Sequence, residues 1–430
     1  MKPTAPRDDD EPLPAPSPAE TAEVPAGDTR DAASRSTVGL PGAVHGTDHR
    51  QFWLARRSYE PAYVHGAYAL GQLATVSEPA LALLGVPDLG PRPAFLDTET
   101  TGLAGGTGTL AFLIGVGVWT GDDLDLHLIF MRDPSEEPAA LHHLTSVLAG
   151  ATGIVTFNGR GFDVPILQTR YIVNRMPPTA LVLPHLDLLT VARQLWRDHL
   201  PSRRLGVLET QILRVIRTGQ DIESALIPYL YRVYLETGET VDMVRIFYHN
   251  EIDVLSLASL LVHVARMVDE PEGMRLAPAE WVGVGRVFDR AGREDDAMAA
   301  WRRAVSGEDG ELDASCAARL WDEMGARHRR RGDLDAALKV WDAWMAADPW
   351  AVSPLVEKAK YYEWAARDLA QALVCTEQAL RRAGALPRGM ERFRVLADLG
   401  HRRERLQRRL AREKSGEPDT DSEPDVARDR

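Results

Sequence analysis

The sequence of 430 residues predicts an α/β domain, built on a mixed β-sheet flanked by helices, followed by an all-helical region. Two observations lead to this prediction. Short apolar runs of strand length alternate with stretches of helical periodicity from about residue 93 to residue 270. From about residue 278 onward, the sequence is rich in Ala, Trp and Arg and contains internal repeats.

The elements of the α/β domain follow from these patterns. Turns rich in Gly and Asp separate the first three apolar runs, which predicts an antiparallel meander of three strands. In chain order we expect strands at 95–98, 109–119 and 124–131, a helix at 136–148, a strand at 153–157, a helix from 162, a strand at 181–186, and helices at 188–200 and 246–268.

Changes of composition divide the chain into five segments. Both ends lack a hydrophobic period and carry many acidic residues and prolines, which is typical of disorder. We therefore expect a disordered acidic and Pro-rich tail at 1–45, an N-terminal extension that packs on the next domain at 46–92, the α/β domain at 93–270, helical repeats at 278–412 and a disordered acidic tail at 413–430.

The helical region contains an internal repeat. A glycine is followed five residues later by alanine and nine residues later by tryptophan in two copies, which start at Gly292 and Gly332, and a weaker third copy starts at Arg367. The period of about 35–40 residues is close to that of tetratricopeptide repeats. The repeats are equally explained as a binding surface for a protein partner and as a helical cap on the α/β domain. The basic last helix, 391–412, either contacts phosphate or caps the repeats.

The formal net charge of −13 does not by itself indicate a nucleic-acid partner. Residues 1–30 and 413–430 each hold three basic and seven acidic residues, so the two ends carry most of this charge. Any contact with nucleic acid must therefore be local. No apolar run has the length of a membrane span or a signal segment, so we expect a cytoplasmic protein without membrane contact. Cys316 and Cys375 are far apart in the sequence, which argues against a zinc knuckle or a disulfide framework.

Two carboxylates stand one residue apart at the end of the first strand, in the segment PAFLDTETTG. Side chains two positions apart lie on the same face of a strand, so Asp97 and Glu99 point the same way. Each raises the cost of ionising the other, and a divalent cation removes that cost. Oxygen ligands on a rigid strand suit Mg²⁺ or Mn²⁺. For this pair alone, an acidic strand end without function is an equal alternative.

A third carboxylate follows the strand at 153–157. In the segment TFNGRGFD a strand ends, a glycine loop turns, and Asp163 stands in the first turn of a helix, where it can face the sheet edge that holds the first two acids. Asn158 is placed to fix this loop or to contact a substrate. Seen alone, Asp163 is better explained as an acid that complements the helix dipole.

The fourth carboxylate lies on the helix at 246–268, in the segment YHNEID. Residues four apart are neighbours on a helix and residues five apart are not, so His249 shares a face with Asp253 and Tyr248 does not. A buried structural histidine beside a surface acid is the alternative. Helix geometry thus favours His249 over Tyr248 as the functional neighbour of Asp253.

Other histidines and acids are less informative. His142 and His143 lie in the middle of a helix and are expected at the surface. His185 and Asp187 stand at a strand end, where a structural role is favoured over a catalytic one.

Taken together, the acidic motifs resemble the DEDD superfamily of 3′–5′ exonucleases, which have a ribonuclease-H-like fold. The resemblance rests on Asp-Thr-Glu-Thr at 97–100, Phe-Asn-Gly-x-x-Phe-Asp at 157–163 and His-x-x-x-Asp at 249–253, and it covers about residues 93–268. The strings LDTETTGLAGGTGT, MRDPSEEP, PHLDLL and YHNEIDVLSLA are similar to the YprB-like branch, whose members often carry C-terminal tetratricopeptide-like repeats. In one departure, the histidine stands four residues before the last aspartate, whereas the superfamily usually places it five before.

The resemblance implies a metal-dependent 3′–5′ exonuclease that hydrolyses single-stranded or frayed DNA or RNA by a two-metal mechanism. The implied ligands of two cations, Mg²⁺ or Mn²⁺, are Asp97, Glu99, Asp163 and Asp253. His249 would be the base or would orient water. The residues expected to contact substrate are Thr98, Thr100, Leu103, Asn158, Arg160 and Phe162, and charge alone adds Arg203 and Arg204 as candidate phosphate contacts.

Two other functions remain open from the sequence. The chain could be a non-catalytic nucleic-acid-binding module or protein scaffold that works through its helical repeats, although four intact acids argue against a degenerate site. It could also be an endonuclease on the same fold, because acids alone do not distinguish cleavage at an end from internal cleavage.

Overall fold

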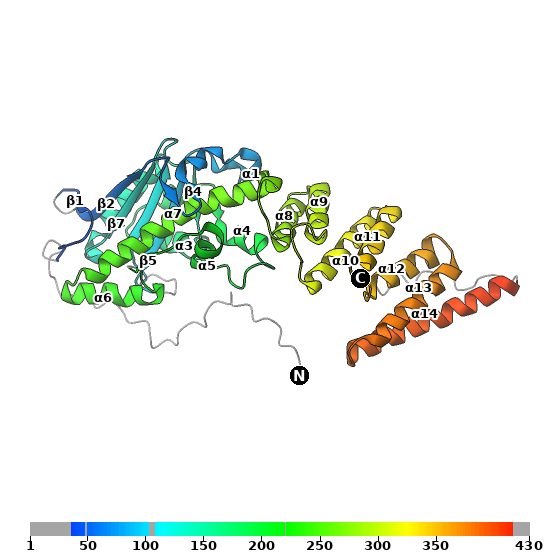
Figure 1. The fold of residues 1–430 in the computed structure, drawn as a ribbon. Coiled ribbons are helices and arrows are strands. Elements are labelled where there is room, and N and C mark those ends of the chain that lie inside the picture. Colours follow the sequence, from blue (N-terminus) through cyan, green and yellow to red (C-terminus); the bar gives the residue numbers. More distant parts are fainter. Residues whose placement is uncertain (1–35, 48–49, 103–107, 220, 416–430) are drawn as a thin grey trace. The chain divides into compact units, whose positions relative to one another are not determined.

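The computed structural model describes residues 36–47, 50–102, 108–219 and 221–415. The chain divides into two compact units, residues 1–304 and 305–430. The first contains a seven-stranded mixed sheet flanked by helices, and the described part of the second is helical, which confirms the predicted fold class (Figure 1). Most of the two expected tails lies outside the described residues. The expected bounds of the tails are wrong at their inner ends, because Ala43–His45 forms a strand and the helix Met390–Ser415 extends past residue 413.

The strands of the sheet lie in the order β1-β2-β7-β6-β5-β8-β9. They are β1 (Ala43–His45), β2 (Phe52–Tyr59), β5 (Pro93–Thr100), β6 (Ala111–Trp119), β7 (Leu124–Phe130), β8 (Gly153–Thr156) and β9 (His185–Asp187). Strands β5, β6 and β7 form the predicted antiparallel meander. Strands β8 and β9 add in parallel beside β5, so the carboxyl ends of β5 and β8 meet at one edge of the sheet.

The sheet extends further toward the N-terminus than the sequence predicts. The extension at 46–92 contributes β2, which pairs antiparallel with β7 and covers its otherwise free edge, and β1 pairs with β2. Strand β2 buries four consecutive residues at its start, so it lacks the alternation by which a half-buried strand is recognised. The rest of the extension comprises β3 (Val64–His65), β4 (Tyr68–Ala69), η2 (Leu70–Thr75), α1 (Glu78–Leu83) and η3 (Pro87–Leu89).

Helices cover both faces of the sheet. The helices up to residue 305 are α2 (Glu137–Leu148), α3 (Asp163–Val173), α4 (Leu188–Leu195), α5 (Leu205–Leu208), α6 (Ile227–Thr237), α7 (Val241–Asp269), α8 (Pro278–Arg290) and α9 (Glu294–Val305), and η4 (Pro134–Glu136) precedes α2. The strand expected at 181–186 forms only at 185–187, after the 3₁₀ turn η5 (Pro178–Leu181).

The long helix α7 crosses β5, β6 and β7 on one face (Figure 1). It approaches closely because a Cβ at Gly115 of β6 would lie only 2.2 Å from the Asn250 side-chain oxygen. Helix α2 covers the opposite face, where His143 Nε2 lies 3.0 Å from His127 Nδ1 of β7. His143 is therefore half-buried and has a partner, contrary to the surface position expected for it, whereas His142 is exposed as expected.

The second unit is built from helices that pack on their neighbours in the chain. They are α10 (Ala314–Arg330), α11 (Leu334–Ala347), α12 (Ser353–Lys360), α13 (Leu369–Ala385) and α14 (Met390–Ser415). Gly325 of α10 admits the Trp341 indole of α11, since a Cβ there would lie 2.5 Å from Nε1. The same contact joins Gly285 and Trp301 in α8 and α9. These contacts explain the repeated tryptophan, and the tetratricopeptide assignment itself stays a prediction.

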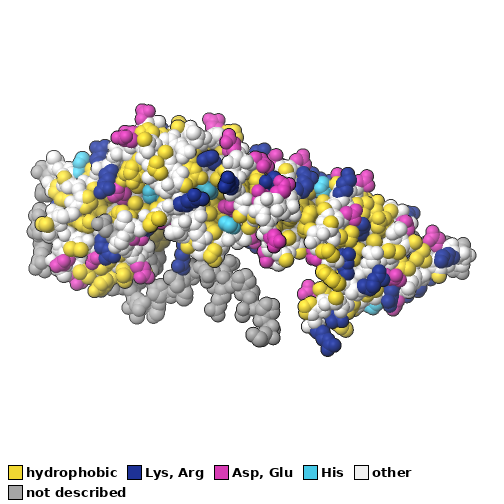
Figure 2. Space-filling view, viewed as in Figure 1, with side chains coloured by type: hydrophobic (Ala, Val, Ile, Leu, Met, Phe, Trp, Pro, Cys, Tyr) yellow, Lys and Arg dark blue, Asp and Glu magenta, His cyan; other side chains and the backbone are white. Residues whose placement is uncertain are grey.

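The basic helix expected at 391–412 is part of α14. Three of its arginines, Arg402, Arg405 and Arg409, pair with Glu363, whose side chain has no exposed surface. These cations neutralise a buried carboxylate, so a capping role explains them without a phosphate ligand. Acidic and basic side chains are interspersed over the face shown in Figure 2. No helix in the described parts of the chain has both the length and the apolar character that crossing a membrane requires.

Candidate active site

The four acids of the sequence motifs converge on one pocket of about 200 Å³ at the end of β5. Asp97 and Glu99 lie on β5, Asp163 opens α3, and Asp253 lies within α7. The pocket is lined by Asp97, Thr98, Glu99, Thr100, Phe157, Asn158, Phe162, Asp163, Ser224, Ile227, Pro228, His249 and Asp253. Four carboxylates from three distant stretches of the chain therefore share one small space.

Two of these carboxylates are oriented by hydrogen bonds from neighbouring elements. The Asn250 amide donates to Asp97 Oδ2 at 2.7 Å, from one turn of α7 before Asp253. The Thr98 hydroxyl donates to Asp163 Oδ1 at 2.5 Å, which ties the start of α3 to β5. Both acids are thus fixed in position and still face the pocket.

Glu99 differs from the other acids because one of its oxygens has no partner. Its Oε1 atom is buried and accepts no hydrogen bond from any of the described residues. A buried carboxylate oxygen without a partner is costly. A bound metal cation would give Glu99 Oε1 the partner that it lacks.

The electrostatics of the pocket lead to the same conclusion. Burial, together with the charges of the other three acids, raises the pKa of Asp97 well above its ordinary value. Burial also raises the pKa of Glu99 to about 8 and that of Asp163 to about 6. The pKa of Asp253 is raised as well, chiefly by burial. Carboxylates that oppose one another's ionisation in this way fit divalent cations, which prefer oxygen ligands.

His249 lies on α7 one turn before Asp253 and lines the same pocket. Its Nε2 atom is 3.4 Å from Asp253 Oδ2 and 4.0 Å from Glu99 Oε1. On the other side of the ring, Nδ1 lies 2.8 Å from Asp221 Oδ1. Burial lowers the pKa of His249, but the three carboxylates outweigh burial and raise it. The side chains of Glu99, His249 and Asp253 could hold one metal ion together.

Tyr248, the other candidate beside the last aspartate, points elsewhere. It does not line the pocket, and its hydroxyl accepts a hydrogen bond from the Thr218 amide at 3.0 Å. The observed geometry therefore agrees with the preference for His249 over Tyr248 that helix periodicity gives.

Three charged residues next to the pocket belong to no motif in the sequence. Glu209, Arg217 and Asp221 come from the stretch between β9 and α6. The Arg217 guanidinium donates to both oxygens of buried Glu209 at 2.7 Å and also pairs with Asp253 Oδ1 and Asp221. Arg217 thereby holds one oxygen of Asp253 and leaves Oδ2 on the His249 side. Its single charge is shared among three carboxylates, so it does not neutralise the pocket.

The glycine loop after β8 is ordered by Asp187. The two Asp187 carboxylate oxygens accept from the backbone amides of Asn158 and Arg160 at 2.8 and 3.1 Å. Asn158 adopts a left-handed conformation, with φ 66°, which asparagine tolerates better than most residues. A Cβ at Gly159 would lie 2.4 Å from the Thr156 hydroxyl, so the turn requires glycine. This turn delivers Asp163 to the pocket.

The structure separates the expected substrate contacts into three groups. Those that line the pocket are Thr98, Thr100, Asn158 and Phe162. Arg160, Arg203 and Arg204 do not line it, and the Arg160 guanidinium donates to the His185 carbonyl oxygen. Leu103 lies outside the described residues. Contact of any of these residues with a substrate stays a prediction.

Comparison with known proteins adds an independent observation. Residues 94–265 match the RNase_H superfamily model. The matched stretch extends from β5 through most of α7 and contains all four acids and His249. The chain is also 29% identical over 295 residues to "Uncharacterized protein YprB" of Bacillus subtilis (strain 168), with 68% of this chain and 70% of the relative covered. The superfamily indicates a nuclease-like function, which is coarser than the exonuclease type implied by the motifs.

Proposed function

We propose that this chain is a metal-dependent 3′–5′ exonuclease that hydrolyses phosphodiester bonds at the end of a single-stranded or frayed nucleic acid. The observation that carries the proposal is the convergence of four buried carboxylates, one with an unpartnered oxygen, in a pocket within the RNase_H superfamily domain. The resemblance of the three motifs to the DEDD exonucleases supplies the direction of cleavage.

The pocket is lined by both acidic and apolar residues. Asp97, Glu99, Asp163 and Asp253 would hold two divalent cations, which would stabilise the charge on the attacking and leaving oxygens of the phosphodiester. The apolar lining residues are Phe157, Phe162, Ile227 and Pro228. Aromatic and aliphatic side chains in the same pocket as a metal site suit the stacking of a nucleobase without selecting its sequence.

The supporting side chains hold this arrangement without reacting themselves. Asn250 and Thr98 orient Asp97 and Asp163 through single hydrogen bonds. Asp187 fixes the loop that carries Asn158 at the rim of the pocket. Because these positions are set before any substrate arrives, little reorganisation is needed when charge develops on the phosphate.

The test is a degradation assay with end-labelled DNA and RNA strands in Mg²⁺, in Mn²⁺ and in chelator. We expect release of nucleotides from the 3′ end that requires metal and falls to the chelator background in Asp97→Ala. Asp122→Ala, at an exposed turn position, is the matched control and retains activity.

Three results would contradict the proposal. Asp97→Ala with wild-type activity would remove the metal site from the reaction. Internal fragments in place of single nucleotides would identify an endonuclease. Absence of both metal binding and cleavage would favour a scaffold that works through the helical repeats.

A further inference from the structure

We infer that His249 is itself a metal ligand: with Glu99 and Asp253 it forms a mixed nitrogen and oxygen site for one transition-metal cation such as Mn²⁺, and Asp221 sets the tautomer of its ring. This inference deepens the proposed function, on which the presence of a metal rests. It changes the role of His249 from the base or water-orienting group that the motifs imply to a ligand.

The distances among the three side chains fit a single ion. One ligand atom from each lies within 4.8 Å of the other two, with Nε2 of His249 at 3.4 Å from Asp253 Oδ2 and 4.0 Å from Glu99 Oε1. Two ligands bound at about 2.1–2.2 Å can be at most about 4.4 Å apart, so the two distances from the ring nitrogen already fall in range. The cause lies in the helix: a spacing of four residues puts His249 directly above Asp253.

The atoms that face this point are incompletely satisfied. Glu99 Oε1 is the buried oxygen without a partner, and it is the Glu99 atom nearest His249 Nε2. The Nε2 atom has a longer contact of 3.3 Å with the hydroxyl of Ser224, which is exposed at the pocket. A cation bound by Glu99 Oε1 and His249 Nε2 would replace the weak hydrogen bond of Nε2 and would give Oε1 a partner.

The far side of the ring is arranged as it is for histidines that bind metals. Such histidines donate their other ring N–H to a carboxylate, a carbonyl or water, which fixes the tautomer and the direction of the free nitrogen. Asp221 Oδ1, at 2.8 Å from Nδ1, provides that acceptor. Arg217 Nη1 lies 3.0 Å from the same nitrogen and can only donate a hydrogen bond, which would need Nδ1 without a proton. In the inferred site the shorter contact, with Asp221, places the proton on Nδ1 and leaves Nε2 free.

A nitrogen ligand alters which metal the site prefers. Mg²⁺ binds almost only oxygen, whereas imidazole suits the first-row transition ions. Manganese accepts both kinds of ligand, so the site made by Glu99, His249 and Asp253 should bind Mn²⁺ more tightly than Mg²⁺. The carboxylates at Asp97 and Asp163 offer only oxygen and carry no such preference.

Pulsed electron paramagnetic resonance of bound Mn²⁺ tests the inference directly. Full-length protein labelled with ¹⁵N-histidine and loaded with less than one equivalent of Mn²⁺ should show a ¹⁵N hyperfine coupling. The coupling should vanish in His249→Ala and persist in Tyr248→Phe, the adjacent control whose side chain lies outside the pocket. Bound Mn²⁺ without ¹⁵N coupling in the wild type, or coupling that survives in His249→Ala, would overturn the inference.

Binding constants from calorimetry give a second measurement that needs no substrate. We expect His249→Ala and Asp221→Asn to weaken Mn²⁺ binding about 10- to 100-fold, and to change Mg²⁺ binding by less than about threefold. Equal weakening for both metals would show a general loss of the pocket and contradict the assignment. If a variant fails to give the far-ultraviolet circular dichroism of the wild type, the ¹⁵N coupling in wild-type protein alone decides the question.

The two proposals fail in different ways. A ¹⁵N coupling in a protein that degrades neither DNA nor RNA would uphold the ligand role and refute the proposed function. Metal-dependent nuclease activity without the coupling would do the reverse, and would return His249 to the role of a base.

Discussion

Glu99 in the acidic pocket and Glu363 in the helical unit are both buried glutamates, but their surroundings differ. Glu99 has an unpartnered Oε1 and shares its pocket with three further carboxylates. Glu363 receives three arginines from α14, two of which also lie over the Trp364 ring. The helical unit neutralises its buried carboxylate with its own cations, and the acidic pocket does not.

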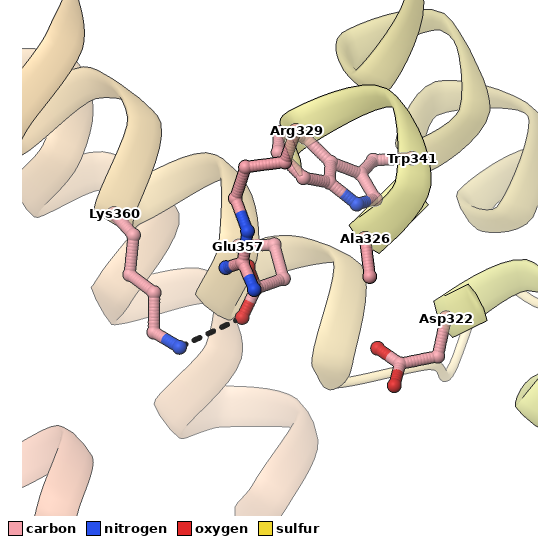
Figure 3. Close-up of a pocket in the computed structure, with 6 residues that line it drawn as sticks. All are labelled: Asp322, Ala326, Arg329, Trp341, Glu357 and Lys360. Atoms are coloured by element: carbon pink, nitrogen blue, oxygen red, sulfur yellow. Dashed lines mark hydrogen bonds and ion pairs between the residues drawn. The ribbon is translucent and has the colours of Figure 1, made fainter. Parts of the chain in front are cut away.

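Pocket size does not indicate which of the two regions holds the candidate active site. The pocket among α10, α11 and α12 is the larger, at about 280 Å³, yet its charges are largely compensated within the chain (Figure 3). There Glu357 pairs with Lys360 at 2.8 Å (Figure 3). It also pairs with Arg329 at 2.5 Å, and Trp341 lines the same pocket. Unbalanced buried charge, rather than volume, therefore distinguishes the candidate active site.

The largest effect on stability is expected where the partner of several buried charges is removed. Glu363→Ala leaves three arginines without their carboxylate and should lower the free energy of unfolding by about 3 kcal/mol, a value reduced by the partial exposure of Arg405. Chemical unfolding followed by circular dichroism measures this. Arg403→Ala, at an exposed position of the same helix, is the control and should change stability by less than about 0.5 kcal/mol. Similar stabilities for both variants would show that the cluster around Glu363 is not structural.

One kind of substitution sharpens the comparison between the two units. Gly115→Ala would bring a Cβ to 2.2 Å from Asn250, and Gly325→Ala would bring one to 2.5 Å from Trp341. Each should cost about 1–3 kcal/mol of stability, as overpacking does. Only Gly115→Ala should also weaken Mn²⁺ binding, because Asn250 orients Asp97.

Calorimetry and thermal melts of the two glycine variants, with Gly400→Ala as the unhindered control, test this expectation. Weakened metal binding in Gly325→Ala would contradict the separation of roles. So would unchanged binding in a destabilised Gly115→Ala protein.

The smallest expected effect is a gain in stability, on substitution of Glu99. The pKa of Glu99 is raised to about 8 from its ordinary 4.5, so between these pH values the folded protein holds a proton that the unfolded chain releases. Stability of the metal-free protein is therefore lost as pH rises through this window. Glu99→Gln removes the penalty and should stabilise the metal-free protein by about 1–2 kcal/mol at pH 8, with no gain near pH 4.5.

Thermal melts of both proteins in chelator at pH 4.5, 6.5 and 8 measure the gain. Saturating Mn²⁺ should reverse its sign, because Glu99→Gln has lost a ligand. A variant that is less stable than wild type in chelator at pH 8 would show that Glu99 is satisfied without metal.

Much of the candidate site follows from short-range patterns. The alternation of a strand places Asp97 and Glu99 on one face, and the period of a helix places His249 beside Asp253. The turn before Asp163 requires residues such as Asn158 and Gly159, because it contains a left-handed conformation and leaves no room for a Cβ at position 159. These relations depend only on backbone geometry within a few residues, so they can be predicted from the sequence.

Residues joined only by the tertiary structure could not be found in this way. Asp221 and Arg217 reach His249 and Asp253 from 28 and 36 residues away, and nothing in their neighbourhood distinguishes them from surface charges. From the sequence, the arginines of α14 are compatible with contact to phosphate or with capping of the repeats. Their pairing with Glu363, about 40 residues earlier, is a contact that the sequence does not indicate. A charged side chain carries no period and no turn preference that reveals its partner.

The sequence by itself determined the α/β class, the central meander and the identity of the four acids, because each is encoded in the spacing of neighbouring residues. Only the tertiary structure decided that β2 completes the sheet, that Asp221 holds His249, and that three arginines of α14 pair with Glu363. The physical reason is that desolvation and charge compensation depend on which distant groups meet on folding, and local spacing does not record that.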